Sequence, residues 1–551
     1  MVALNLLFSS LLLSSAVASP LSSKPLRIPT INPKDVLCQL PIIKKFLCPI
    51  TGAAALNVQT PIGVARGTAD PAGAKRFTVK YASASRWAYS TVASAWNFPN
   101  GSPDELVLPL ACPQAGVDPS AYTEDCLSMV LYVPPGLTLV SAAPTLMWIH
   151  GGSFVVGSAT GPGLDGSKLA IATDSIVAVV QYRLGALGFM APDGKTNLAA
   201  KDIVNALQFL KKVLPAFGGS PSKITIAGQS AGANMVRALL AAPSASSLFR
   251  SAILQSDPMN YGFLSSTTQQ AMQSHFNGLI DCGPSDSSCW NSLSLETILN
   301  AQGKLSNDSV AIDPSTGLAQ PIRVVRDNQF ITSPLDSTAP FPSVNKPILV
   351  TSVLHEAGFA IYKGFETPLP QEWLYPVCEA TFGSRTDVVL SSPYYPAALG
   401  STDARDQLQL MGTDYLWKCS GWTFARNWVQ NGGSAYVAEY AIGASYPGNE
   451  AVPFCTEAGK VCHQDDIMIV FGTAANPAPA QSALINQMQK HYKAFLNNGN
   501  PNAAGLPTWT PAASPNVQPL RLGGPGQVSV GACDPSFWGQ AAQYDYQFYN
   551  I

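Results

Sequence analysis

The sequence predicts an α/β fold with a large, mostly parallel central sheet, helices on both faces of the sheet and further helical insertions. Short apolar runs alternate with helical patterns through the first half of the chain. A strand, a tight turn and a helix follow one another around Ser230, and residues 197–214 show one buried helical face. Strands that alternate with helices indicate parallel pairing, because a crossover helix returns the chain to the same end of the sheet.

The predicted strands are short, apolar segments rich in β-branched residues, as expected in a sheet that is covered on both faces. They are 127–133, 145–149, 176–182, 224–227, 252–254, 347–351 and 435–440. Between the third and the fourth, Ile203, Leu207, Leu210 and Leu214 recur at helical spacing. No linker, charge block or internal repeat interrupts the pattern, so residues 56–551 are predicted to form a single domain.

The amino terminus predicts export. Residues 1–18 have the length and apolar core of a signal peptide, and Ala16-Val17-Ala18 is a small-residue cleavage site. We expect a secreted, extracellular protein without a stable membrane anchor, since no later segment offers about 18 consecutive apolar residues. Residues 19–55 are compatible either with a propeptide or with an ordered N-terminal arm.

The composition points to a small-molecule partner. Charged residues make up 12% of the chain and the net charge is −2, which excludes a general field that attracts nucleic acid or anionic membranes. Eleven cysteines suit an oxidising exterior, and an odd number leaves at least one of them unpaired within the chain. Asn100 and Asn307 begin glycosylation sequons.

The turn at residues 228–232, which reads GQSAG, carries the first chemical signal. A nucleophile held on a sharp strand-to-helix turn needs small neighbours, so Gly228 and Gly232 let the strand and the helix approach while Ser230 projects its hydroxyl outward. The N–H group of Ala231, at the helix start, points to where an oxyanion would form. Alone, this pentapeptide is often only a loop.

A second signal follows the strand at 145–149. Gly151, Gly152 and Ser153 form a turn whose N–H groups can face inward, as a developing oxyanion requires. A Gly-Gly turn is usually only a turn. Here the interpretation as an oxyanion-binding turn is favoured because the serine turn lies about 80 residues later, which leaves room for the strand and helix between them.

A serine nucleophile needs a base, and the chain has five histidines. His150 belongs to the glycine turn, and His275 and His491 lie in helical sequence that we expect at the surface. His463 directly follows Cys462 in a loop that a Cys455 to Cys462 bond would hold rigid. His355 is its rival, and we expect replacement of His355 to keep most activity.

The acid that orients the base is sought at a strand end. Glu356 follows the strand at 347–351. A solvated surface residue is the ordinary interpretation of an isolated glutamate, and of a histidine in an acidic loop such as that of His463. Position alone therefore selects neither residue.

In chain order, these motifs resemble the type-B carboxylesterases and lipases, the cholinesterase-like branch of the α/β-hydrolase fold, and among them secreted fungal-type esterases. The resemblance spans about residues 58–538. It rests on Glu124-Asp125-Cys126-Leu127, on the blocks 181–185 and 217–219, and on the turn 228–232.

The resemblance implies a role for each site residue. Ser230 is the nucleophile, Glu356 the acid and His463 the base, in the order that this fold imposes. The oxyanion donors are the N–H groups of Gly152, Ser153 and Ala231, with Ser153 in place of the family's usual third glycine. The reactants are a small-molecule carboxylic ester and water, and neither a metal nor an organic cofactor is implied.

The cysteines are assigned in two ways. The resemblance implies the pairs Cys112 with Cys126, Cys282 with Cys289, and Cys419 with Cys533, while proximity suggests Cys38 with Cys48 and Cys455 with Cys462. Cys378 is left over, and we expect it to be a buried spare cysteine.

The predicted function is a secreted serine carboxylesterase that cleaves small to medium esters through an acyl-enzyme. The alternatives are a lipase or sterol esterase that acts on lipid esters and a non-catalytic adhesion module. The resemblance implies that a lipase would carry its lid in the loop closed by the first disulfide. Here the loop between Cys112 and Cys126 is short and has few apolar residues, which argues against a mobile lid from this loop, although an insertion elsewhere, such as 283–307, could serve. Presence of all three triad residues argues against the adhesion module.

Overall fold

The computed structural model describes residues 56–316, 320–336, 341–342, 344–396, 402–525 and 528–538. The predicted signal peptide, the whole segment 19–55 with its predicted Cys38 to Cys48 bond, and the carboxyl-terminal residues 539–551 lie outside this part. The predicted division into a signal peptide, an N-terminal arm or propeptide, and one domain therefore stays a prediction.

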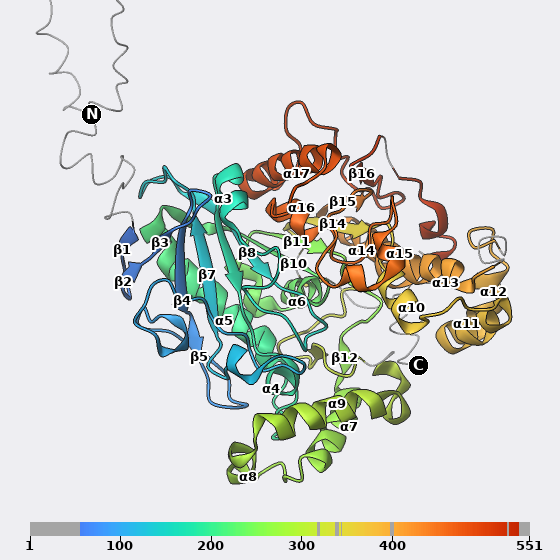
Figure 1. Cartoon of the computed structure of the whole chain (residues 1–551), viewed down its shortest axis with the longest axis horizontal. Coiled ribbons are helices and arrows are strands. Elements are labelled where there is room, and N and C mark those ends of the chain that lie inside the picture. Colours follow the sequence, from blue (N-terminus) through green and yellow to red (C-terminus); the bar gives the residue numbers. More distant parts are fainter. Residues whose placement is uncertain are drawn as a thin grey trace, which may run out of the picture. The chain divides into compact units, whose positions relative to one another are not determined.

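A ten-stranded mixed sheet forms the centre of the described chain (Figure 1). From one edge to the other, its order is β16 (Leu520–Leu522), β15 (Ser434–Tyr440), β14 (Pro347–Val353), β11 (Ser251–Gln255), β10 (Gly219–Gln229), β8 (Ala143–Ile149), β9 (Ile176–Val180), β7 (Ser128–Val133), β4 (Lys75–Lys80) and β3 (Thr68–Ala69). Every pair from β16 to β9 is parallel. Only the pairs of β9 with β7, β7 with β4, and β4 with β3 are antiparallel, so the predicted large, mostly parallel sheet is confirmed.

The helices fall into groups by their place between the strands (Figure 1). Those between the strands up to β11 are α3 (Ser167–Thr173), α4 (Gly185–Phe189), α5 (Leu198–Val213) and α6 (Ala231–Leu240). Between β11 and β14 come α7 (Ser266–Leu279), α8 (Ser287–Ser292) and α9 (Leu295–Ile312). Between β14 and β15 come α10 (Gly358–Gly364), α11 (Leu374–Phe382), α12 (Thr386–Leu390), α13 (Ala404–Gly412) and α14 (Cys419–Gln430), and after β15 come α15 (Pro453–Thr456), α16 (Ile467–Phe471) and α17 (Pro479–Asn498).

Three small two-stranded sheets accompany the central sheet in the described chain. They pair β1 (Asn57–Thr60) with β2 (Gly63–Arg66), β5 (Ala82–Ser83) with β6 (Thr91–Val92), and β12 (Leu264–Ser265) with β13 (Val325–Arg326). Of the helices in the described part, none combines the length and the apolar character needed to cross a membrane.

The sheet is buried on both faces because successive side chains of a strand point to opposite sides. In β8, Met147 and Ile149 join the apolar cluster that includes α5 and α6, whereas Leu146 and Trp148 join the cluster that includes α3, α16 and α17. This double cover explains why the strands read as continuous apolar runs.

Each predicted strand overlaps an observed strand, with ends that differ by up to a few residues except at β10. That strand begins at Gly219, and its register with β8 shifts between Gly219 and Ile224. Pro221 lies in this irregular stretch, and proline cannot donate a ladder hydrogen bond. The apolar run from Ile224 therefore predicted only the regular part of β10.

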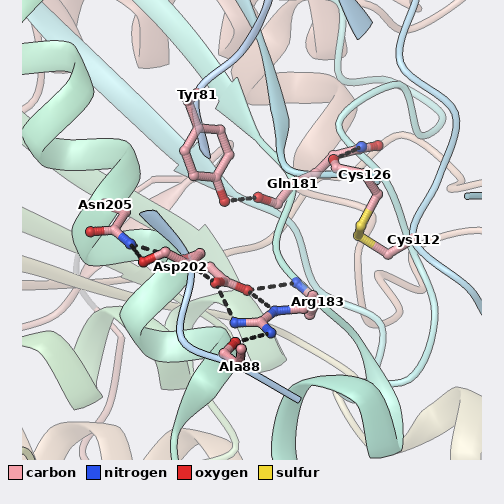
Figure 2. A network of polar contacts seen from close by, with 9 residues as sticks. Tyr81, Ala88, Cys112, Cys126, Gln181, Arg183, Asp202 and Asn205 are labelled. Atoms are coloured by element: carbon pink, nitrogen blue, oxygen red, sulfur yellow. Dashed lines mark hydrogen bonds and ion pairs between the residues drawn. A yellow bond between two sulfur atoms is a disulfide. The ribbon is translucent and has the colours of Figure 1, made fainter. Parts of the chain in front are cut away.

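A buried ion pair fixes the loop that follows β9 (Figure 2). Arg183 donates from Nε and Nη2 to both carboxylate oxygens of Asp202 on α5, at 2.8 and 2.7 Å, and from Nη1 to Ala88 O at 2.6 Å. The neighbouring Tyr182 donates its hydroxyl to His150 O at 2.9 Å. The end of β9 is thus tied to α5 on one side and to the end of β8 on the other.

Four disulfides join cysteines of the described residues: Cys112 with Cys126, Cys282 with Cys289, Cys419 with Cys533, and Cys455 with Cys462. These are four of the five predicted pairs, and the fifth, Cys38 with Cys48, lies outside the described residues. Cys378 is free and buried, as expected.

Candidate active site

Ser230 occupies the turn between β10 and α6 in a conformation that L-residues rarely adopt, with φ 57° and ψ −126°. Glycine is required on both sides of it. A Cβ atom added at Gly232 would lie 2.1 Å from Ile149 O, and one at Gly228 would lie 2.4 Å from the carbonyl carbon of Gly232. The two small residues therefore allow strand and helix to meet beneath the serine.

The loop after β8 also has positive φ angles, 107° at Gly152 and 52° at Ser153. A Cβ atom at Gly152 would lie 2.2 Å from Val156 O, so only glycine fits there. Within the described chain, the N–H groups of Gly152, Ser153 and Ala231 donate no hydrogen bond to a protein atom. All three residues line the same cavity as Ser230. Unpaired N–H groups beside a hydroxyl can bind a negatively charged oxygen.

His463 and Glu356 are in direct contact, although 107 residues separate them. The Nδ1 atom of His463 lies 2.6 Å from Glu356 Oε2, and the other carboxylate oxygen accepts from Val353 N at 2.8 Å. Glu356 is only 1% exposed. Because a carboxylate accepts, Nδ1 carries the proton and Nε2 of the neutral ring is left as an acceptor.

The side-chain amide of Gln229 contacts Nε2 of His463. Its Nε2 atom lies 3.2 Å from His463 Nε2, and in the described part of the chain the Ser230 hydroxyl makes no hydrogen bond. In proteins without substrate, the contact between nucleophile and base is often long. The sequence pointed to Ser230 through its turn, whereas nothing in it indicated the contact made by Gln229.

A cavity of about 550 Å³ contains the three predicted triad residues. Ser230, Glu356 and His463 line it together with Trp417, whose ring lies 5.4 Å from the His463 ring. Trp417 belongs to a π-helical turn, Thr413–Lys418, that joins α13 to α14. Sequence analysis missed Trp417 because its approach to His463 depends on how the helical insertion between β14 and β15 packs against the loop that carries His463.

A second cavity, of about 630 Å³, lies on the other side of the glycine turn. It shares Gly152, Val156 and Gln464 with the first, and none of its lining residues is an acid, a lysine or an arginine. Burial lowers the pKa of its histidine, His150, to about 4, so that ring is neutral at neutral pH. The second cavity therefore favours an uncharged group.

Two further carboxyl groups lie in the loop that carries His463. Burial raises the pKa of Asp465 to about 6, and burial together with the charge of Glu356 raises the pKa of Asp466 to about 7. Asp466 Oδ2 accepts from Gln255 Nε2, while its Oδ1 has no protein partner. Proton uptake by Asp466 thus limits the negative charge that accumulates beside Glu356.

Among the described residues, none of the other four histidines lines the cavity that contains Ser230. His150 stacks on Tyr182 with ring centres 4.6 Å apart, and His275 contacts Asp308 at 2.9 Å. The expected surface position of His491 is wrong: it is fully buried on α17, and its Nδ1 lies 2.7 Å from Pro501 O. A polar side chain on a helix is no guide to burial when a loop carbonyl can satisfy it.

The two sequons differ in their surroundings. Asn307 is exposed on α9, whereas Asn100 donates from Nδ2 to Leu108 O at 2.9 Å. Glycosylation at either position stays a prediction.

Comparison with known proteins agrees with this geometry. The sequence model of the carboxylesterase family matches residues 66–538. Carboxylesterase 5A of Homo sapiens is 29% identical over 511 residues, which are 85% of this chain and 82% of that protein. The cAMP-regulated D2 protein of Dictyostelium discoideum is 30% identical over 359 residues, 64% of this chain and 65% of that relative's length.

A solved structure, named PNB esterase, shares the fold. It matches 85% of this chain and 95% of its own with a TM-score of 0.66 at 23% identity. The family model covers most of the present sequence, and the fold is the α/β-hydrolase fold of that structure. The chain therefore belongs to the carboxylesterase family and is a carboxylic ester hydrolase.

Proposed function

We propose that this protein is a secreted serine esterase that cleaves small to medium carboxylic esters through an acyl-enzyme on Ser230. The observation that carries the proposal is the meeting, in one cavity, of Ser230, the paired His463 and Glu356, and three unpaired N–H groups.

Acylation uses each of these groups. Substrate displaces the amide of Gln229 from His463 Nε2, and that atom takes the proton of Ser230 as the serine oxygen attacks the ester carbonyl carbon. Glu356 stabilises the imidazolium through Nδ1. The N–H groups of Gly152, Ser153 and Ala231 hold the negatively charged oxygen of the tetrahedral intermediate. His463 then protonates the leaving alcohol, and the acyl group stays on Ser230.

Deacylation repeats these steps with water. His463 takes a proton from a water molecule, whose oxygen attacks the acyl carbon. The second tetrahedral intermediate collapses, the proton returns to Ser230, and the carboxylic acid leaves. The products are one alcohol and one acid for each ester and water consumed.

The two cavities support the substrate class. The alcohol receives its proton from His463, so we place it on the side of Gln464, which lines both cavities. The second cavity is lined by uncharged residues, which suits an uncharged alcohol group. The acyl group then occupies the cavity that contains Ser230.

One observation favours the alternative of a lipase or sterol esterase. Leu108, Val117 and Val156 all line the second cavity and are 41%, 37% and 39% exposed, which makes part of its rim apolar. Such a rim suits contact with a lipid ester. The rate of hydrolysis on emulsified lipid ester, compared with the rate on dissolved ester, separates the lipase from the esterase.

Secretion is proposed from two features. The first 18 residues read as a signal peptide, and four disulfides join eight of the nine described cysteines. Disulfides persist in oxidising compartments.

The decisive variant is Ser230→Ala, assayed with p-nitrophenyl acetate. We expect a loss of at least about 10⁴-fold in kcat with an unchanged melting temperature. Ser288→Ala, at an exposed position on α8, is the matched control and should keep wild-type activity. Turnover by Ser230→Ala within about tenfold of wild type would overturn the nucleophile assignment, and an inactive wild type would favour the adhesion module.

A further inference from the structure

We propose that His355 is a positioning residue that acts through Val461 to hold His463 against Glu356. The inference rests on the proposed function. It differs from the expectation drawn from sequence, in which His355 was only a rival base of little consequence.

The contact between His355 and Val461 is double. The backbone N–H of His355 donates to Val461 O at 2.9 Å, and Val461 N–H donates back to the imidazole Nδ1 at 3.1 Å. The two segments run parallel here, with His355 bridged to Cys462. Both backbone polar groups of Val461 are therefore satisfied by one residue.

The two residues of this contact are close in sequence to the proposed acid and base. His355 immediately precedes Glu356, and Val461 lies two residues before His463. The two hydrogen bonds between His355 and Val461, here called the clamp, therefore join the loop that carries the acid to the loop that carries the base. The distance of 2.6 Å between His463 Nδ1 and Glu356 Oε2 depends on the separation that this clamp sets.

The imidazole of His355 is suited to accept a hydrogen bond. Its ring packs edge-on against Phe454, with centres 5.5 Å apart. Burial and the neighbouring Lys460 lower the pKa of His355 to about 4, so the ring is neutral and Nδ1 can accept at neutral pH. Val461 is 1% exposed, so without this acceptor its N–H group would be buried and unpaired.

Other restraints act on the far side of Val461. Cys462 is bonded to Cys455 and donates its N–H to Asp465 Oδ2 at 2.7 Å, and Asn449 Nδ2 donates to His463 O at 3.0 Å. These contacts keep the loop folded when His355 is changed. Loss of the clamp should therefore shift His463 without unfolding the protein.

The expected kinetic effect is specific. Neither His355 nor Val461 lines the two cavities, so substrate binding should not change. A base displaced by about 1 Å can cost up to roughly 100-fold in rate. We therefore expect kcat to fall while KM stays constant.

The test compares replacement of His355 by asparagine and by glutamine, whose side-chain amides lie at different distances from the backbone. In His355→Asn the amide oxygen can reach the place of Nδ1, whereas in His355→Gln it lies nearer the place of Nε2. We expect His355→Gln to lose about tenfold or more in kcat with KM within twofold, and His355→Asn to stay within about threefold of wild type. His355→Leu, which has no acceptor, should resemble His355→Gln, and His275→Leu, at a partly exposed position that lines neither cavity, is the histidine control.

Rates are expressed per active site, by titration with a p-nitrophenyl phosphonate in parallel with the melting temperature. A merely structural role would reduce the number of titrated sites and leave kcat per site unchanged. Unchanged kcat per site in His355→Gln, or equal losses in the Asn and Gln variants, would overturn the inference. Ser230→Ala is assayed beside them: its retained activity would overturn the proposed function, whereas its loss with an unaffected His355→Gln overturns only the positioning role.

Discussion

His463 Nδ1 lies 2.6 Å from Glu356 Oε2, and the carboxylate is 1% exposed. A buried carboxylate that accepts from Nδ1 fixes the tautomer in which Nε2 is free to take a proton. In the proposed mechanism, the contact defines which ring nitrogen takes the proton of Ser230.

The first prediction concerns Glu356. Glu356→Gln keeps the shape of the side chain but can donate to Nδ1, which favours the wrong tautomer. We expect kcat to fall by about 10⁴-fold, with little change in KM. Steady-state kinetics on p-nitrophenyl acetate measure the effect, and an activity within tenfold of wild type would show that another group orients His463.

A second prediction concerns the stability of the loop that carries His463. Burial and the Glu356 charge raise the pKa of Asp466 to about 7, whereas an unfolded aspartate titrates near about 3.9. Between these values the folded state keeps a proton that the unfolded state releases. Stability from this group is therefore complete below about pH 4 and is lost as the pH rises through 7.

Asp466→Asn removes this titration. We expect the melting temperatures of the variant and the wild type to be similar near pH 4 and to separate as the pH rises to 8, with the variant higher. Asp174→Asn, at an exposed acid, is the control and should follow the wild type. If the melting temperatures of Asp466→Asn and wild type differed by the same amount at every pH from 4 to 8, the result would contradict a buried Asp466 that keeps its proton.

The third prediction separates an esterase from a lipase. The loop closed by Cys112 and Cys126 has a sequence separation of 14 and lines only the second cavity, and no residue of the other candidate lid, 283–307, lines either cavity. Neither segment therefore lines the cavity that contains Ser230, as a lid over the serine would. We expect hydrolysis of dissolved short-chain esters with no jump in rate when the substrate passes its solubility limit. Sharp activation on emulsified long-chain triglyceride, with little activity on soluble esters, would favour the lipase.

Local patterns in the sequence predicted the parts of the fold that depend on neighbouring residues. The strand and helix around Ser230 follow from an apolar run, two glycines and a helical period, and the structure shows how close the backbones approach at Gly232. The same holds for the glycine turn at Gly152. In both places the need for a small residue is visible in the sequence itself.

Contacts between distant segments could not be predicted in this way. Trp417 reaches His463 only because the insertion between β14 and β15 folds over the site, and His355 meets Val461 across 106 residues. His491 was expected at the surface and is buried, because a loop carbonyl from Pro501 satisfies its ring. None of these pairings leaves a local pattern, since each depends on packing of the complete domain.

Covalent trapping at Ser230 tests the central claim most directly. The protein is treated with a p-nitrophenyl phosphonate ester and digested with trypsin, which releases residues 224–237 as one peptide whose only serine is Ser230. We predict one phosphonyl group per chain, carried by this peptide, with simultaneous loss of esterase activity and no labelling of Ser230→Ala. An adduct on another peptide that accounts for the lost activity, or full inactivation with peptide 224–237 unmodified, would contradict the assignment of Ser230 as the nucleophile.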